Sequence, residues 1–424
     1  MRFYLPLCLS LGVNTAHGDS SHTSSIHILD DDSLLNIFYL YRPQILDGDE
    51  DTEVLIRGGR KWDCERWWYK LAHICQRWRN VILRSASYLD LCLVCTFGTP
   101  VADMLAHSPP LPLAIDYVDL GRDFTAKEEG IFLALEQRDR IRRIRLELPL
   151  PILQELVVII DEEYPMLEYL IIAPPRKYKS AVLTLPETLQ APHLRHLTLA
   201  CFSIPIGSRL LTAAVGLTVL SLVMRPSSNF QLNFLLQWLS FMPQLETLVI
   251  VFRYTGSNRD VERRLMDNPT TTHVTLPNLR QFTFVGVSAY LEAVVRITAP
   301  RLEKLNIEFF PQSTYSVPRL VQFMDTTKLR FDSAKFEFSE ERVNVEVYFR
   351  GAEMYGLKTS VQCLGLGWQV ACVVQIFNSL NPVSSTVEHL TLKHSVHSLS
   401  SEEHDEVDRT EWRELLRQIG RAHV

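Results

Sequence analysis

The chain has few cysteines, no long apolar run and no excess of basic residues. Its 8 Cys among 424 residues are too few for a disulfide scaffold and fit a reducing compartment. The longest apolar stretch, Val361 to Phe377, is interrupted by three Gln residues, whereas a membrane-spanning helix needs about 20 mostly apolar residues. With 43 Lys and Arg against 49 Asp and Glu, the net charge of −6 argues against nucleic-acid binding. We therefore expect an intracellular protein, cytoplasmic or nuclear, with no membrane and no nucleic-acid partner.

Both ends of the sequence look unlike folded structure. Residues 1–25 are rich in Ser, Thr and His, and we expect a disordered leader there. A secretory signal is the alternative, because Arg2 precedes a short apolar run at residues 5–11. At the other end, residues 419–424 resemble the translation of a common sequencing-adapter oligonucleotide. We expect this ending to be an artefact and the natural protein to continue beyond Gln418.

An amphipathic helix is predicted from about residue 31. Asp30, Asp31 and Asp32 are good amino-terminal caps and interact favourably with a helix dipole. Apolar residues then recur at helical spacing until a proline ends the pattern. The apolar stripe consists of Leu34, Ile37, Phe38 and Tyr41, and the proline is Pro43.

An acidic segment, residues 47–53, follows this helix and is succeeded by Gly58 and Gly59. A segment of this composition has little to bury, so we expect an exposed loop. A calcium-binding EF-hand loop would need a later Gly and a terminal Glu at fixed positions, and that pattern is missing. We therefore expect no metal site here.

A second helical pattern runs from Trp67 to Ile82. Three of its residues are Trp, a residue type that is enriched at protein interfaces. A small helical core would account for the same spacing. One face of this helix carries Leu71, Ile74, Cys75, Trp78 and Ile82.

The two helical segments together resemble an F-box, in the form found in fungal F-box proteins. Residues 29–38 resemble that family's Leu-Pro-x-Glu-Leu-Leu-x-x-Ile-Phe-like helix, with Asp30 in the place of the usual Pro. Residues 67–79 resemble its Trp-Trp-x-x-Leu-Ala-x-Val-Cys-x-x-Trp-Arg segment. The resemblance continues at residues 88–91 and 108–113. It implies an F-box domain at residues 26–90, which includes the acidic loop as an insertion.

An F-box implies a small helical bundle that docks on the Skp-type adaptor of a cullin ubiquitin ligase. By this resemblance, nine residues form the adaptor-binding face or the core beneath it. They are Leu29, Leu34, Leu35, Ile37, Phe38, Leu71, Ile74, Cys75 and Trp78.

A repeated apolar template dominates the rest of the chain. The pattern apolar-x-x-apolar-x-apolar recurs about every 27 residues, with helical patterns such as residues 234–239 and 370–377 between copies. One strand and one helix per 20–29 residues is typical of leucine-rich repeats. The Asn or Cys that usually follows each copy is missing, so we expect an irregular array. The copies begin at Ile141, Leu167, Leu194, Leu217, Leu245, Leu279, Leu302, Phe331, Val361 and Val387.

These patterns predict an α/β fold in which a small all-α F-box module precedes an irregular leucine-rich-repeat solenoid. Parallel strands would line the concave face and helices the convex face. We expect the array at residues 136–418, truncated at its carboxyl end, and a linker at residues 91–135 that packs on the first repeat. A non-repetitive α/β fold is the alternative.

The outward-facing strand positions are the candidate target-binding residues, because a concave surface of stacked strands suits the recognition of another protein. They lie between the buried positions of each copy. The candidates are His196, Thr198, Ser221, Thr247, Gln281, Thr283, Lys304, Asn306, His389 and Thr391.

Catalytic and cofactor signals are weak. Cys92 and Cys95 form a C-x-x-C pair inside an alternating run that reads as a strand, so a structural role is expected instead of redox or zinc chemistry. Five Arg residues between 138 and 145 read as the solvated face of the first repeat, with an anion-binding site as the alternative. The chain carries no P-loop, H-E-x-x-H or G-x-S-x-G motif. We expect neither enzymatic activity nor a cofactor.

The resulting hypothesis is a substrate-recognition subunit of an SCF-type (Skp-cullin-F-box) ubiquitin ligase. The F-box would bind the Skp-type adaptor and through it a cullin, and the repeat face would bind an unknown target protein. The alternative is a leucine-rich-repeat scaffold whose divergent F-box does not join a ligase, because Asp30 and the acidic insertion depart from the family pattern.

Overall fold

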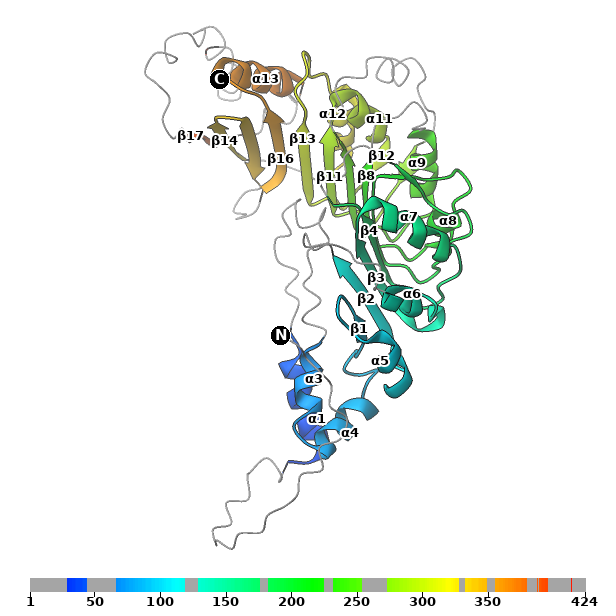
Figure 1. Cartoon of the computed structure of the whole chain (residues 1–424). Coiled ribbons are helices and arrows are strands. Elements are labelled where there is room, and N and C mark those ends of the chain that lie inside the picture. The colour runs from blue at the N-terminus through cyan, green and yellow to red at the C-terminus, as the bar shows by residue number, and fades with distance from the viewer. Residues whose placement is uncertain are drawn as a thin grey trace, which may run out of the picture. The chain divides into compact units, whose positions relative to one another are not determined.

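The computed structural model describes residues 29–43, 66–118, 129–175, 182–224, 232–253, 273–327, 332–348, 355–379, 387, 389–395 and 413. The chain divides into two compact units. Within the described residues, the first unit contains 29–43 and 67–91, and the second contains Arg66 and the residues from Cys92 onward (Figure 1).

The first unit is a small helical bundle of α1 (Asp31–Tyr41), α3 (Trp67–Ala72) and α4 (Gln76–Arg84). The segment predicted as one helix from Trp67 to Ile82 is two helices, because the chain turns at residues 73–75. Cys75 is the N-cap of α4, and its Sγ accepts a hydrogen bond from the backbone N–H of Trp78 at 3.5 Å. A capping side chain satisfies a backbone donor that a helix start otherwise leaves unpaired, so α4 begins anew at this point.

The second unit is built on a 13-stranded sheet with the order β1-β2-β3-β4-β6-β8-β9-β11-β13-β16-β15-β14-β17. Its strands are β1 (Leu93–Cys95), β2 (Leu113–Val118), β3 (Ile141–Glu147), β4 (Tyr169–Ala173), β6 (His196–Ala200), β8 (Val219–Met224), β9 (Thr247–Phe252), β11 (Gln281–Gly286), β13 (Lys304–Phe309), β14 (Ser333–Ser339), β15 (Arg342–Tyr348), β16 (Tyr355–Gln362) and β17 (His389–Ser395). All neighbouring strands are parallel except those that pair with β15. Two short pairs of parallel strands lie outside the main sheet: β5 (Leu183–Thr184) with β7 (Phe202–Ser203), and β10 (Val274–Thr275) with β12 (Ile297–Thr298).

Helices connect most of these strands. They are α5 (Val101–His107), α6 (Glu129–Leu135), α7 (Leu150–Ile159), α8 (Arg209–Ala213), α9 (Leu232–Ser240), α11 (Ser288–Val294), α12 (Pro318–Thr326) and α13 (Leu366–Ser379). Helices α6 to α12 lie along one face of the sheet (Figure 1). The helices predicted at residues 234–239 and 370–377 are confirmed as α9 and α13. The protein is therefore an α/β protein with a large, mostly parallel sheet.

The strand positions follow the apolar template. In nine of its ten copies the last two apolar residues lie in a strand of the main sheet. Representative positions such as Leu197, Leu220 and Leu248 are at most 1 % exposed. Each such Leu contributes about 1.5–3 kcal/mol when it is fully buried. The repeated positions in the copies that begin at Ile141 to Leu302 form the core between sheet and helices, whereas Leu392 in the last copy is 45 % exposed.

The copy at Val361 is the exception. Val361 lies near the end of β16, whereas Leu364 is 74 % exposed and Leu366 begins α13. The preceding strand, β15, was not predicted because its alternation of Val343, Val345 and Val347 does not contain the apolar template. Such alternation is typical of an antiparallel strand with one solvated face. Strands β14 and β15 form an antiparallel hairpin, and β16 returns to lie beside β13.

Residues 91–135 contribute to the sheet as well. The segment expected to be a linker contains β1 and β2, and β2 pairs in parallel with β3. The predicted strand around Cys92 and Cys95 is confirmed as β1. No helix in the described ranges is both long and apolar enough to cross a lipid bilayer.

Candidate docking surfaces

The core of the first unit is formed by one side of α1 and by α4. Leu34 and Phe38 are at most 1 % exposed, as is Ile82 on α4. The rings of Phe38 and Trp78 meet edge to face with centroids 4.9 Å apart. Such aromatic pairs add about 0.5–1.5 kcal/mol beyond the area that they bury, so this contact helps to fix α1 against α4.

The start of α1 is determined by its acidic residues. The Asp30 side chain accepts a hydrogen bond from the backbone N–H of Ser33 at 2.6 Å, and this bond lowers the pKa of Asp30. Asp31 and Asp32 lie in the first turn, where negative charge interacts favourably with the helix dipole. The predicted helix start is thus confirmed.

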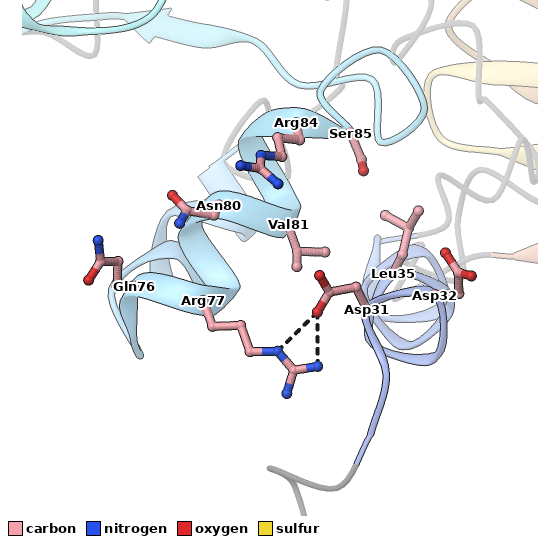
Figure 2. Close-up of a pocket in the computed structure, with 9 residues that line it drawn as sticks. All are labelled: Asp31, Asp32, Leu35, Gln76, Arg77, Asn80, Val81, Arg84 and Ser85. Carbon is pink, nitrogen blue, oxygen red and sulfur yellow. Dashed lines mark hydrogen bonds and ion pairs between the residues drawn. The ribbon is translucent and has the colours of Figure 1, made fainter.

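A pocket of about 490 Å³ lies between α1 and α4 (Figure 2). Its main ion pair joins the Arg77 guanidinium to Asp31 Oδ1 at 2.9 Å, and Arg77 also donates to the backbone carbonyl of Leu29. Figure 2 shows Arg77 reaching from α4 toward Asp31 at the start of α1. The pocket is lined by Asp31, Asp32, Leu35, Gln76, Arg77, Asn80, Val81, Arg84 and Ser85. Acidic and basic residues balance in this lining, so it favours neither an anion nor a cation.

The second half of α1 presents apolar side chains to solvent. Ile37 is 45 % exposed, Leu40 is 75 % and Tyr41 is 57 %. Residues three and four positions apart share one face of a helix, so these three form a continuous stripe, named the α1 surface below. In the turn between α3 and α4, Ile74 is 58 % exposed. Large exposed apolar groups that lie together mark sites of protein contact.

The structure sorts the nine predicted adaptor-binding residues into three groups. Leu34 and Phe38 are buried and support the core, whereas Ile37 and Ile74 are exposed and available for contact. The half-buried residues are Leu29, Leu35, Leu71, Cys75 and Trp78. Leu40, the most exposed apolar residue of α1, was missed, although its spacing of three from Ile37 would have identified it.

Strand register brings most of the predicted target-binding residues into two rows on one face of the sheet. The outer row runs through His196, Val219, Thr247, Gln281 and Lys304 on neighbouring strands. The middle row, two residues further along each strand, runs through Thr198, Ser221, Val249, Thr283 and Asn306. His389 and Thr391 lie apart from both rows on β17, which is separated from β13 by three strands.

The two rows differ in accessibility. The outer row is half-buried, and the ring of His196 stacks on Tyr169 with centroids 4.2 Å apart. The middle row is buried, with Thr198, Ser221 and Thr283 at most 1 % exposed and Asn306 8 % exposed. Each middle-row residue lies between neighbours along its own strand and in-register neighbours on both adjacent strands. The predicted middle-row residues are therefore not free surface, and the accessible candidates are the outer row, His389 and Thr391.

A charged network lies further across the sheet. Lys335 Nζ is 3.2 Å from Glu346 Oε2, and Lys358 Nζ is 3.2 Å from Glu346 Oε1. Burial alone would raise the pKa of Glu346, but hydrogen bonds from Tyr348 and Lys335 outweigh burial and leave the pKa lowered. A hydrogen bond to Glu337 is the main cause that raises the pKa of Lys335. This network holds its charges in fixed pairs between β14, β15 and β16.

The basic cluster near β3 is largely neutralised. Arg142 Nε lies 2.9 Å from Glu168, and Arg145 lies 2.7 Å from Glu147. Arg138 pairs with Glu162 at 3.2 Å. The alternative of an anion-binding site at these arginines is therefore disfavoured.

The C-x-x-C pair, considered above for redox or zinc chemistry, is buried in the sheet. Cys92 and Cys95 are at most 1 % exposed, and burial raises the pKa of Cys95 to about 12, so neither is a reactive thiolate. In the residues that the structure describes, no three His, Cys, Asp or Glu side chains group as metal ligands. No protein-family model matches the chain, and no curated protein matches it significantly.

Proposed function

We propose that the chain is the substrate-recognition subunit of an SCF-type ubiquitin ligase, with the first unit as its F-box. The observation that carries this proposal is the α1 surface. Ile37, Leu40 and Tyr41 are in solvent while Leu34 and Phe38 on the same helix fill the core. The F-box resemblance of residues 29–38 and 67–79 supports a Skp-type adaptor, and through it a cullin, as the partner of this surface.

The second unit supports the other half of the proposal, an irregular leucine-rich-repeat solenoid that binds a target protein. Its parallel strands recur with the period of the apolar template, and helices α6 to α12 lie along one face (Figure 1). Side chains at equivalent positions therefore form rows across the sheet, as repeat proteins use for recognition. We propose the outer row, from His196 to Lys304, as the first candidate contact region.

In this proposal the chain performs no bond chemistry of its own. It would hold the target on one unit and the adaptor on the other. Tethering replaces a bimolecular encounter between target and ubiquitin-conjugating enzyme by a reaction at high effective concentration.

Direct binding of the purified chain to a Skp-type adaptor tests the proposal. Ile37→Asp and Ile74→Asp place a charge at exposed positions, so the first unit should stay folded while its affinity falls at least about tenfold. Val158→Asp on α7 is the matched control, because Val158 is 76 % exposed and belongs to the second unit. Leu34→Asp is unsuitable as a test, because Leu34 is fully buried and its substitution would unfold the unit.

Failure of the wild-type chain to bind the adaptor, with both units folded, would contradict the ligase proposal. That result would instead favour a repeat scaffold outside any ligase. Adaptor binding that survives both substitutions would show that the α1 surface and Ile74 are not the docking site.

A further inference from the structure

Strands β4 to β11 are buried on both faces of the sheet. Leu197 and Leu199 on β6 face the helices and Thr198 between them faces the other way, yet all three are at most 2 % exposed. In the same middle row, Ile171 on β4 is 1 % exposed and Val249 on β9 is fully buried. Helices α6 to α12 lie along the opposite face (Figure 1), so they do not account for this burial. A second layer must cover the middle row, as is usual for parallel sheets.

The centre of this second face is uncharged and largely apolar. Val223, Val251 and Val285 lie two positions beyond the middle row and are at most 8 % exposed. Together with the middle row they extend from β4 to β11, which is about 19 Å at a strand spacing of about 4.8 Å. We name this area the covered face. It consists of Ile171, Thr198, Ser221, Val223, Val249, Val251, Thr283 and Val285.

The outer row, which borders the covered face, is basic. It carries Arg143 on β3, His196 on β6 and Lys304 on β13, and the row positions between them hold no acidic residue. Arg145 in the middle row is already paired with Glu147. A layer that combines apolar side chains with a run of acidic residues therefore matches both the covered face and its border.

One segment of this chain has that combination. Residues 44–65 connect α1 to α3 and lie outside the described residues. Five acidic residues between Asp47 and Glu53 are followed directly by the apolar run Val54-Leu55-Ile56. Running out and back at about 3.3 Å per residue, the segment can reach about 36 Å from its ends, which exceeds the width of the covered face.

The end of this segment is placed at the sheet. Arg66, the first described residue after it, belongs to the second unit, whereas Trp67 belongs to the first. Burial raises the pKa of Cys95 on β1 to about 12, and the charges of Arg140 and Arg66 act against this rise, so Arg66 lies near β1. Strand β1 is separated from β4 by only β2 and β3. The segment therefore ends within reach of the covered face.

We propose that residues 44–65 dock on the covered face of the same chain. The apolar run from Val54 to Ile56 packs on the covered face, and the acidic run lies along the basic outer row. The docking itself does not depend on the proposed function. Its consequence does: the segment occupies part of the face assigned to the target protein, so the segment and the target would exclude each other.

Thiol labelling of Ser221→Cys in the full chain tests the proposal. Ser221 is 1 % exposed at the centre of the covered face, so a maleimide should label Cys at this position slowly. Replacing residues 47–56 by a Gly-Ser linker of equal length should raise the labelling rate at least about tenfold. A synthetic peptide of residues 44–65 should restore the protection. Cys95, buried on the helix side of the same sheet, is the internal control and should stay protected.

A second variant keeps the length and the apolar run of the segment. It replaces each acidic residue by its amide, which removes the match to the outer row, so labelling of Ser221→Cys should again be faster than in the parent chain. This variant and the peptide decide the matter if the linker chain also exposes Cys95. The substitutions are Asp47→Asn, Asp49→Asn, Glu50→Gln, Asp51→Asn and Glu53→Gln.

Equal labelling of Ser221→Cys in the parent, linker and amide chains, with Cys95 protected, would overturn the proposal. The covering layer would then be another part of the chain, such as the leader. Labelling is measured without the Skp-type adaptor and should be unchanged by Ile37→Asp. A failure of the ligase proposal and a failure of this docking would thus be told apart.

Discussion

Glu292 provides a sharp test of how the neighbouring helices α11 and α12 are joined. Its side chain on α11 accepts hydrogen bonds from the backbone N–H groups of Arg319 at 2.8 Å and Leu320 at 3.1 Å. These donors belong to the first turn of α12, whose own N-cap residue, Val317, makes no side-chain cap bond. Glu292 therefore caps α12, the next helix along the chain, while only 7 % exposed.

Glu292→Ala should destabilise α12 by about 2–4 kcal/mol. The substitution leaves two backbone N–H groups without an acceptor, at about 1–3 kcal/mol each, and removing the buried carboxylate offsets part of that sum. Glu292→Gln keeps one acceptor oxygen and removes the buried charge, so it should destabilise α12 less than Glu292→Ala does. Hydrogen exchange measured by mass spectrometry on peptides covering α12 reports this locally. A loss of 2–4 kcal/mol corresponds to roughly 30- to 800-fold faster exchange of the most protected amides.

The same residue gives a pH dependence of known sign. Burial raises the pKa of Glu292 above its usual value, although the N–H groups of Arg319 and Leu320 act in the opposite direction. The folded state then binds the proton more tightly than the unfolded state, so stability is greatest at low pH and falls as the pH rises through the folded pKa. Glu292→Gln should remove this part of the pH dependence. Exchange rates of α12 in Glu292→Ala that match the wild type would refute the capping role.

Three further predictions concern packing and thiol chemistry. Phe38→Ala should cost the first unit about 3–5 kcal/mol, measured by the denaturant dependence of tryptophan fluorescence, because Phe38 is 1 % exposed and packs on Trp78. Gly286→Ala should cost about 1–3 kcal/mol in thermal unfolding, because an added Cβ would lie 2.9 Å from the ring of Phe284. Cys95 should resist iodoacetamide at neutral pH in the folded chain and react once the chain is unfolded, because it is fully buried and its pKa is raised to about 12; rapid labelling of the native protein would contradict its buried position.

Strand positions were predictable from the sequence because the apolar positions of the template are the positions that are buried in the structure. Side chains at positions such as Leu197 and Leu199 must face the helices, and their spacing of two fixes a strand. The order and direction in which those strands pair were harder to predict from the sequence. The alternation of Val343, Val345 and Val347 is typical of an antiparallel strand with one solvated face, but it lacks the repeated apolar template, so the β14–β15 hairpin was not predicted.

For the candidate sites, too, the sequence predicted which residues share a face but not which of them are exposed. Helical spacing identified Ile37 and Phe38 as members of one apolar stripe, yet one is exposed and the other buried. Their accessibility depends on where α4 packs, which is a tertiary property. Likewise, period-two alternation placed Thr198 and His196 on one face of the sheet, but the burial of Thr198 follows from its surroundings in three dimensions. A cavity lined by the loop after β13 and the loop after β16 depends on segments that are distant in sequence, and no local pattern indicated it.

The central claim, that the first unit docks on a Skp-type adaptor through the α1 surface, is tested most directly by isothermal titration of the full chain with that adaptor. The account predicts saturable one-to-one binding that Ile37→Asp weakens at least about tenfold and Val158→Asp leaves unchanged. Absence of binding by the folded wild-type chain, or equal binding by wild type and Ile37→Asp, would contradict it.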